Sequence, residues 1–114
     1  GATFVARGFA GDPAFTAELI KQAIEHKGFA IVDVLQPCVT FNNLNTFQWF
    51  KERIYKLENH NTSDKIAAMK KALETEKLPV GIFYREEKGY KSCSHAIKKI
   101  PPSSIAVKLY HIAL

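Results

Sequence analysis

The sequence predicts an α/β fold with a small, mainly parallel sheet and flanking helices. Short apolar runs rich in β-branched and aromatic residues, at positions 2–6, 29–35 and 80–84, have the length and composition of buried strands. Between these runs, apolar residues recur at steps of three and four, which is typical of amphipathic helices. The first strand, helix and strand fall within about 35 residues and form a βαβ unit, in which the two strands lie parallel.

The first helix has clear start and stop signals. Asp12 is a good N-cap, and Pro13 suits the first helical position because its φ angle is preset and its missing N–H is not needed there. The expected apolar face consists of Phe15, Leu19, Ile20, Ala23 and Ile24. We expect the helix to end with the basic residues His26 and Lys27, followed by Gly28 in the left-handed conformation.

Two more helices are expected between the second and third predicted strands. Asn45 can cap the first of them, and Gln48 three residues later completes a capping box. Its apolar stripe consists of Phe47, Phe50, Ile54 and Leu57. Trp49 lies off that stripe and can cover a neighbouring subunit or domain. A polar linker then leads to a helix over 63–75, whose inward side is expected to carry Ile66, Met69 and Leu73.

The pattern changes after residue 88. We assign residues 1–88 to one α/β domain and residues 89–114 to a basic, irregular tail. Within the tail, Ile105, Val107 and Leu109 alternate as a short strand would. A sheet of this size leaves apolar runs and strand edges uncovered. We therefore expect either a homo-oligomer or a tail that folds back onto the sheet.

Charge and hydropathy exclude several classes of protein. The formal net charge is +5, but Lys and Arg are interleaved with Glu along most of the chain, which is typical of solvated helix faces and argues against nucleic-acid binding. No run approaches the roughly 18 apolar residues that cross a bilayer, and no signal segment is evident, so we expect a soluble, cytoplasmic protein with no membrane partner. The two cysteines favour reduced thiols or a metal role over a disulfide framework.

Cys38 is the residue whose position points most clearly to chemistry. It follows the strand predicted at 29–35, beside Pro37, which cannot donate a ladder hydrogen bond and so ends that strand. In open α/β sheets, ligands and cofactors bind in the crevice at the carboxyl ends of the strands. Cys38 is therefore a candidate metal ligand. The alternative is that Cys38 is a small buried residue with a purely structural role.

Two further positions are weaker candidates for a site. Arg7 precedes a glycine-marked turn and a helix amino terminus, which attracts anions, but Asp12 at that terminus repels them and favours a structural turn. Cys93 and His95 could bind a metal, but two ligands in an irregular tail make a poor site. No nucleophile–base pair and no paired carboxylates can be defended from the spacings.

Three segments together resemble a known family. They are the stretch 1–12, the stretch Leu-Gln-Pro-Cys-Val-Thr-Phe-Asn at 35–42 and the stretch Leu-Pro-Val-Gly-Ile-Phe-Tyr at 78–84. They resemble the carboxyl-terminal part of the β subunit of 2-oxoacid:ferredoxin oxidoreductases of the pyruvate:ferredoxin oxidoreductase type, which is the thiamine-diphosphate-binding subunit. The resemblance covers residues 1–88, so the expected fold is a fragment of a thiamine-diphosphate-binding fold.

The resemblance implies a function and a site. Cys38 would supply one thiolate to a [4Fe-4S] cluster, and upstream cysteines that begin with a Cys-x-x-Cys pair would supply the others. This sequence has no Cys-x-x-Cys pair. The Gly-Asp-Gly stretch and the downstream Asn that hold Mg²⁺ and the diphosphate of thiamine diphosphate in that family are also missing from it. We therefore expect the isolated chain to be inactive and to bind none of these cofactors.

The complete enzyme implied by the resemblance oxidatively decarboxylates a 2-oxoacid with coenzyme A and passes the electrons to ferredoxin. Its other partners would be the α subunit or the remaining enzyme domains. A hypothesis from a different class is a noncatalytic α/β domain that dimerises or binds a partner. The missing catalytic motifs are consistent with that alternative.

Overall fold

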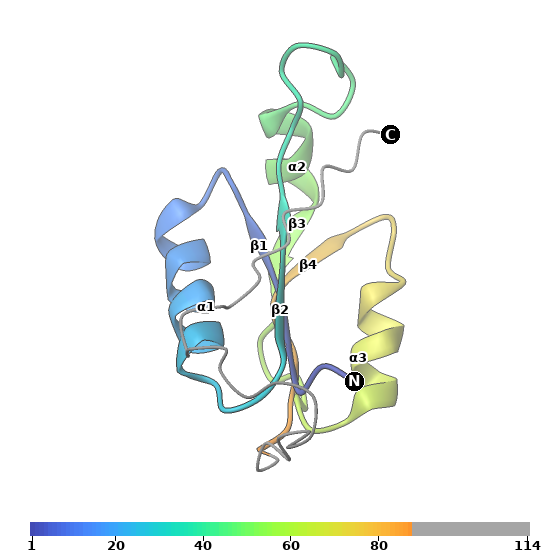
Figure 1. Cartoon of the computed structure of the whole chain (residues 1–114). Coiled ribbons are helices and arrows are strands. Elements are labelled where there is room, and N and C mark those ends of the chain that lie inside the picture. Colours follow the sequence, from blue (N-terminus) through green and yellow to red (C-terminus); the bar gives the residue numbers. More distant parts are fainter. Residues whose placement is uncertain (88–114) are drawn as a thin grey trace.

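The computed structural model describes residues 1–87, which form a four-stranded sheet with helices on both of its faces (Figure 1). The elements in chain order are β1 (Phe4–Phe9), α1 (Pro13–Glu25), β2 (Ala30–Leu35), α2 (Phe47–Arg53), β3 (Ile54–Lys56), α3 (Lys65–Ala72) and β4 (Leu78–Arg85). Helix α1 covers β1 and β2 on one face, and α3 covers β4 on the other (Figure 1). The predicted α/β class is confirmed.

The strand order is β2-β1-β4-β3. β1 pairs parallel with β2, and β3 pairs parallel with β4, whereas the central pair β1 and β4 is antiparallel. The mainly parallel sheet and the βαβ unit are therefore confirmed. β1 runs further than the predicted strand at 2–6, because its pairing with β2 extends from Phe4 opposite Ala30 to Phe9 opposite Leu35.

The start of α1 is formed as predicted. Asp12 Oδ1 accepts a hydrogen bond of 3.2 Å from the N–H of Phe15, and Pro13 occupies the first helical position. Leu19 and Ala23 are buried against the sheet residues Phe4 and Ala6. Ile24, expected on the same face, is exposed, so the buried face is narrower than the predicted one.

Thr16 is the buried polar residue of this helix. Its hydroxyl donates to the carbonyl of Phe9 at 2.8 Å and accepts from the N–H of Phe9 at 3.0 Å. Gly8 allows this close approach, because a Cβ atom at Gly8 would lie 2.8 Å from the Thr16 side chain. The glycine predicted to mark a turn therefore lies inside β1.

The predicted glycine cap at the end of α1 is wrong. The helix ends at Glu25, and His26 follows in an extended conformation. Within the part of the chain that the structure describes, Gly81 is the glycine with positive φ. Gly28 instead lies against Thr3, where a Cβ atom would come 2.2 Å from Oγ1. The same hydroxyl is 2.8 Å from His26 Nε2, so a tertiary contact ends the helix.

The second helix is capped one residue later than predicted and is shorter. Thr46 Oγ1, rather than Asn45, accepts from the N–H of Trp49 at 3.3 Å. The helix ends at Arg53, and Ile54, which was expected to continue its stripe, begins β3, which pairs with the start of β4. β-Branched Ile54 suits this strand, and the pairing with β4 decides the conformation.

The inward face predicted for the third helix is also wrong. α3 buries Ala68 against Phe83 and Tyr84, whereas the residues expected inside are exposed. Those exposed residues are Ile66, Met69 and Leu73. A small alanine at the contact lets the helix approach the sheet closely, so the larger apolar residues lie at the sides of the contact or in solvent.

The face of the sheet beside α3 is open near β2. Phe29 and Ile31 are exposed there, and a cavity of about 360 Å³ lies between these residues and α3, where Met69 lines it. The strand predicted at 105–109 and the tail at 89–114 lie outside the described residues. The predicted homo-oligomer or folded-back tail therefore stays a prediction. No helix within residues 1–87 is long and apolar enough to cross a membrane.

Candidate functional site

Cys38 lies where the sequence predicts it, just beyond the carboxyl end of β2. The strand ends at Leu35, and the buried ring of Pro37 anchors the chain before it enters the loop that leads to α2. The thiol of Cys38 is free, and its side chain is half-buried. In Figure 1 this loop forms the upper end of the molecule, beyond the ends of both layers of helices.

Asn42 gives the loop its shape. Its backbone N–H donates to the carbonyl of Cys38 at 3.1 Å, which closes a turn around the cysteine. Its side-chain Oδ1 accepts from the N–H groups of Leu44 at 3.0 Å and Asn45 at 2.9 Å, and its Nδ2 donates to Asn45 Oδ1 at 3.0 Å. This is the way Asn side chains commonly fix turns. The loop is therefore held by its own polar groups.

The pKa of the Cys38 thiol is lowered in this turn. Hydrogen bonds from the N–H groups of Phe41, Thr40 and, more weakly, Asn42 lower the pKa of the Cys38 thiol, and partial desolvation opposes them. Donors of this kind stabilise a thiolate, which is the form of cysteine that binds metals and acts as a nucleophile. A lowered pKa is compatible with a metal ligand, and the predicted role of Cys38 stays a prediction.

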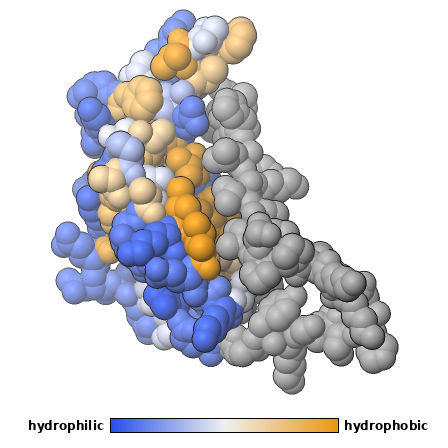
Figure 2. All heavy atoms as spheres, turned by 60° about the vertical axis from the view of Figure 1, so that its left-hand side comes forward, coloured by the Kyte–Doolittle hydropathy of each residue, from blue (hydrophilic) through white to orange (hydrophobic). Residues whose placement is uncertain are grey.

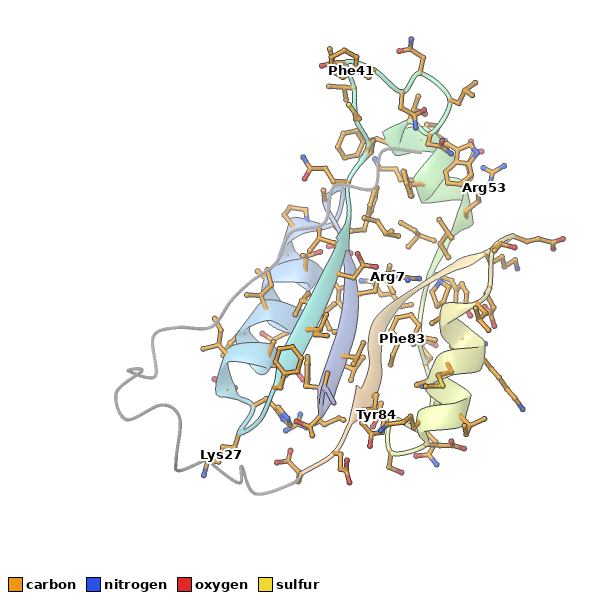
Figure 3. All side chains as sticks on the ribbon, turned by 45° about the vertical axis from the view of Figure 1, so that its right-hand side comes forward. Arg7, Lys27, Phe41, Arg53, Phe83 and Tyr84 are labelled. Carbon is orange, nitrogen blue, oxygen red and sulfur yellow. The ribbon has the colours of Figure 1, made fainter. Side chains whose placement is uncertain are left out.

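The loop also carries exposed apolar side chains. Val39 is 73% exposed, Phe41 is 90% exposed and Leu44 is 83% exposed. Figure 3 shows Phe41 at the outermost end of the molecule, pointing away from the sheet and helices. In the space-filling view of Figure 2, apolar side chains appear at this same upper end. Cys38 is thus flanked on its own loop by large apolar groups in water.

Helix α2 fixes the far end of the loop. The ring of Phe9, at the end of β1, packs against Phe47 at 5.9 Å and Phe50 at 5.7 Å between centroids. The guanidinium of Arg53 lies 4.3 Å from the centroid of the Trp49 ring, and Figure 3 shows Arg53 on the helix below the loop. Trp49 therefore has a partner within the chain, and its predicted contact with another subunit stays a prediction.

Cys38 is a lone ligand in the described part of the chain. Residues 1–87 contain no group of three or more His, Cys, Asp or Glu side chains that could hold a metal ion. The weaker candidates Cys93 and His95 lie outside the described residues. Any metal centre at Cys38 must therefore draw further ligands from elsewhere.

The structural interpretation of the Arg7 region agrees with the geometry. Arg7 Nε donates to Asp33 Oδ2 at 2.8 Å across β1 and β2, and its guanidinium lies over the Phe83 ring. At the start of α1, Asp12 pairs with Lys56 Nζ at 3.1 Å. Arg7 is therefore engaged within the sheet, and an acidic group occupies the helix amino terminus.

One polar cluster was not predicted. Tyr55 donates to Glu74 Oε2 at 2.5 Å, and Lys71 Nζ donates to Glu74 Oε1 at 2.8 Å and to the Tyr55 oxygen at 3.1 Å. Burial, and then the hydrogen bond to Glu74, raises the pKa of Tyr55, while the hydrogen bond from Lys71 lowers the pKa of Glu74. The cluster ties β3 to the end of α3. The i, i+3 spacing of Lys71 and Glu74 was the signal that sequence could offer.

Comparison with known proteins identifies the family. The sequence profile for the carboxyl-terminal region of the pyruvate ferredoxin oxidoreductase beta subunit matches residues 38–99, which is more than half of the 114 residues and begins at Cys38. The chain belongs to this family. The resemblance inferred from the segments around Cys38 and β4 is thereby confirmed.

Relatives of this β-subunit family match over most of the chain. The 2-oxoacid:ferredoxin oxidoreductase subunit beta of Sulfolobus sp is 47% identical over 100 residues, which covers 76% of this chain and 33% of the relative. The protein of the same name from Saccharolobus solfataricus is 42% identical, with the same coverage of both chains. The chain spans about a third of the length of these relatives.

A solved structure from the same family has a similar fold. It is a 2-oxoglutarate:ferredoxin oxidoreductase from Magnetococcus marinus with 2-oxoglutarate, coenzyme A and succinyl-CoA bound. The TM-score is 0.73 and the identity is 43%, over 77% of this chain and 31% of that one. The fold described here is therefore that of part of a β subunit of this type.

Proposed function

We propose that this chain is the carboxyl-terminal part of the β subunit of a 2-oxoacid:ferredoxin oxidoreductase. The complete enzyme oxidatively decarboxylates pyruvate or another 2-oxoacid with coenzyme A and passes the electrons to ferredoxin. The family match and the names of the relatives support this proposal, as do the 2-oxoacid and coenzyme A bound to the Magnetococcus marinus enzyme. The partners are the α subunit or the remaining enzyme domains, and the enzyme is cytoplasmic.

The observation that carries the proposal is the environment of Cys38. Cys38 follows the carboxyl end of β2 in a turn that the Asn42 N–H closes on the Cys38 carbonyl, and backbone N–H groups of residues 40–42 lower the pKa of its thiol. This suits a thiolate ligand of a [4Fe-4S] cluster, because such clusters are held by cysteine thiolates and their reduction potentials depend on hydrogen bonds to sulfur. The bound cluster would supply one-electron transfer. Cys38 would hold one iron atom, and the loop would keep its thiolate oriented.

The residues of this chain fit one ligand of the cluster and no more. A [4Fe-4S] cluster takes four cysteine thiolates, and residues 1–87 contain one cysteine. The three others come from another part of the enzyme in this proposal. Thiamine diphosphate and Mg²⁺ also bind elsewhere, since the sequence has no Gly-Asp-Gly stretch. The isolated chain is then inactive and binds none of these cofactors.

A noncatalytic domain that dimerises or binds a partner is the second candidate. The exposed Phe29, directly before the edge strand β2, and Ile31 within that strand favour it, because apolar residues at an open sheet edge invite association. The two candidates differ in one respect that can be measured: the first requires that Cys38 bind iron in the complete enzyme.

The test substitutes Cys38 in the complete enzyme, purified without oxygen. Cys38→Ser nearly preserves side-chain volume but replaces a soft thiolate with a poor iron ligand. We expect a loss of cluster iron and a decrease of more than about tenfold in ferredoxin-linked turnover, with the circular dichroism spectrum unchanged. Cys93→Ser is the matched control and should keep its iron. Equal iron content and turnover in a folded Cys38→Ser enzyme would contradict the proposal.

The isolated chain provides a second test of the same proposal. Anaerobic reconstitution with iron and sulfide should leave no stable visible absorption from thiolate-to-iron charge transfer, because one thiolate cannot hold a cluster. Stoichiometric incorporation of a cluster into a monomer of this chain would show that the ligand assignment is wrong.

A further inference from the structure

Helix α3 and the open face of the sheet beside it form one apolar surface, which we call the α3 surface. It consists of five large apolar side chains, each at least 40% exposed: Phe29, Ile31, Ile66, Met69 and Leu73. Met69 joins the two parts, because it belongs to the helix and also lines the cavity of about 360 Å³ beside Phe29 and Ile31. Large apolar groups gathered in this way are unusual on a surface that stays in water, and they commonly mark an interaction site.

The exposed apolar residues of α3 lie on a side of the helix that does not contact the sheet. At about 3.6 residues per turn, Ile66, Met69 and Leu73 share one side, whereas Ala68, which is buried against β4, lies on another. Figure 3 shows α3 at the edge of the molecule, with side chains that extend away from the sheet. The packing of α3 on the sheet therefore does not account for this apolar stripe.

Lysine side chains flank the stripe. By the same helical spacing, Lys65 lies on one flank of it and Lys70 on the other. Within residues 1–87 neither of them is in an ion pair, whereas Lys71 pairs with Glu74 at 2.8 Å. Lys65 also lines the cavity, where its Nζ lies 5.3 Å from the centroid of the Tyr84 ring. The rim that α3 gives to this surface is therefore positively charged.

The positive rim argues against two occupants that the chain itself could supply. Residues 88–114 contain five lysines and no Asp or Glu, so the rim repels them. In a symmetric contact between two copies, the same patch of each copy meets the other, and the lysines of one α3 would face those of its partner. Like charges placed together across an interface are unfavourable. The charge pattern therefore favours a different, acidic partner.

We propose that the α3 surface docks an apolar surface rimmed by Asp or Glu carboxylates, contributed by a part of the complete enzyme outside this chain. Apolar groups of the partner cover Met69 and Leu73, and its carboxylates pair with Lys65 and Lys70. The cavity has room for one large side chain, and anchors of this kind commonly contribute most of the binding free energy. This inference rests on the proposed function, because the complete enzyme supplies the partner, but it does not require that Cys38 bind iron.

The place of α3 in the fold distinguishes this contact from that of the electron acceptor. Figures 1 and 3 show the loop that follows β2 and carries Cys38 at the upper end of the molecule, and α3 in its lower half. An acceptor of electrons from a cluster at Cys38 must approach that upper end. The partner at the α3 surface is therefore a structural part of the enzyme and not ferredoxin.

A site-specific crosslink tests the contact directly. Met69 is replaced by the photoreactive p-benzoylphenylalanine in the complete enzyme. Ile24 is the matched control, because it is 55% exposed where Met69 is 56% exposed, and it lies on α1, which covers the opposite face of the sheet. We expect irradiation to join position 69 to a peptide outside this chain that carries Asp or Glu beside apolar residues. A crosslink to residues 88–114, to a second copy of α3, to ferredoxin or to a peptide without acidic residues, or a yield no higher than at position 24, would each overturn the proposal.

Charge reversal gives a second readout. In the enzyme labelled at position 69, Lys70→Glu should lower the crosslink yield several-fold at low ionic strength, and added salt should restore part of it, because salt screens the repulsion. Lys21→Glu, which reverses an exposed lysine on α1, is the control and should leave the yield unchanged. Replacing the crosslinked peptide's acidic residue by Lys should restore the yield in the Lys70→Glu enzyme. Equal yields from the Lys70→Glu and Lys21→Glu enzymes would contradict the inference.

The two proposals fail in different ways. Unchanged iron content and turnover in Cys38→Ser would defeat the proposed role of Cys38 and leave the crosslink from position 69 unaffected. Cluster iron that depends on Cys38, together with no crosslink from position 69 to an acidic peptide outside this chain, would defeat the α3 contact alone.

Discussion

The substitution Thr16→Val probes the contact that joins α1 to the end of β1. The Thr16 hydroxyl accepts from the N–H of Phe9 and donates to its carbonyl, and both residues are buried. Valine has nearly the same shape as threonine but has no hydrogen-bonding group. The substitution therefore removes the two hydrogen bonds and leaves the packing almost unchanged.

The expected loss of stability follows from what remains unpaired. The Phe9 carbonyl still accepts from the N–H of Asp12 at 3.0 Å, so it keeps a partner. The Phe9 N–H loses the hydroxyl that accepts from it. A buried, unsatisfied N–H is unfavourable by about 1–3 kcal/mol, and 1 kcal/mol corresponds to a decrease of roughly 4–8 °C in melting temperature for a domain of this size.

Urea denaturation of the 114-residue chain measures the effect, with Thr16→Ser as the control. Serine keeps the hydroxyl and loses a methyl group that lies next to Gly8, which lowers the free energy of unfolding by about 0.8 kcal/mol. If the hydrogen bonds contributed nothing, the more apolar valine would be neutral or stabilising. A Thr16→Val chain as stable as the wild type would therefore refute the reasoning.

Three further predictions concern other described residues. The hydrogen bond from Lys71 lowers the pKa of Glu74, so the ionised carboxylate stabilises the fold at pH values above its unfolded pKa. As the pH falls below about 4.3, the wild type should therefore lose more stability than Glu74→Gln. Matching urea midpoints over a pH series would contradict this. Gly81 has a φ angle of +134°, and a Cβ atom there would lie 3.3 Å from the Cβ of Leu57, so Gly81→Ala should lower the free energy of unfolding by about 1–3 kcal/mol. A thermal melt that does not change would argue against strain at this position. Backbone N–H groups lower the pKa of the Cys38 thiol. In a chain without the second cysteine, the rate of alkylation by iodoacetamide should therefore rise with an apparent pKa below about 8.5, the ordinary value for cysteine. An apparent pKa at or above that value would contradict the contribution of these N–H groups.

The elements that local chemistry determines could be predicted. The Asp12 cap and Pro13 at the first turn require residues that are adjacent in sequence, and both are formed. The parallel pair β1 and β2 follows from the length of the connection between them, since a helix must cross from one strand to the next. These features depend on a few neighbouring residues, which is why the sequence indicates them.

The features that depend on tertiary contacts could not be predicted. The expected cap at Gly28 does not form, because His26 contacts Thr3 instead. The apolar stripe does not continue as a helix after Arg53, because the next residues pair with β4 as β3. The antiparallel pairing of β1 and β4 has no local signal, because an apolar run is the same in either direction. On α3, the small Ala68 determines the buried face, whereas hydropathy alone favoured its larger neighbours.

The candidate site shows the same division. Pro37 after an apolar run placed Cys38 at the carboxyl end of β2, and the sequence was sufficient for that. The lowered pKa of its thiol depends on the turn that Asn42 closes, which residue types alone do not specify. The exposure of Phe41 likewise depends on the path of the loop.

The most direct measurement of the central claim locates the iron. Diffraction data from crystals of the complete enzyme, collected on both sides of the iron absorption edge, give an anomalous map that shows iron atoms alone. We predict density for a four-iron cluster in covalent contact with Cys38 Sγ. A fully occupied cluster whose four thiolates all come from other residues, with Cys38 unbound, would contradict the account.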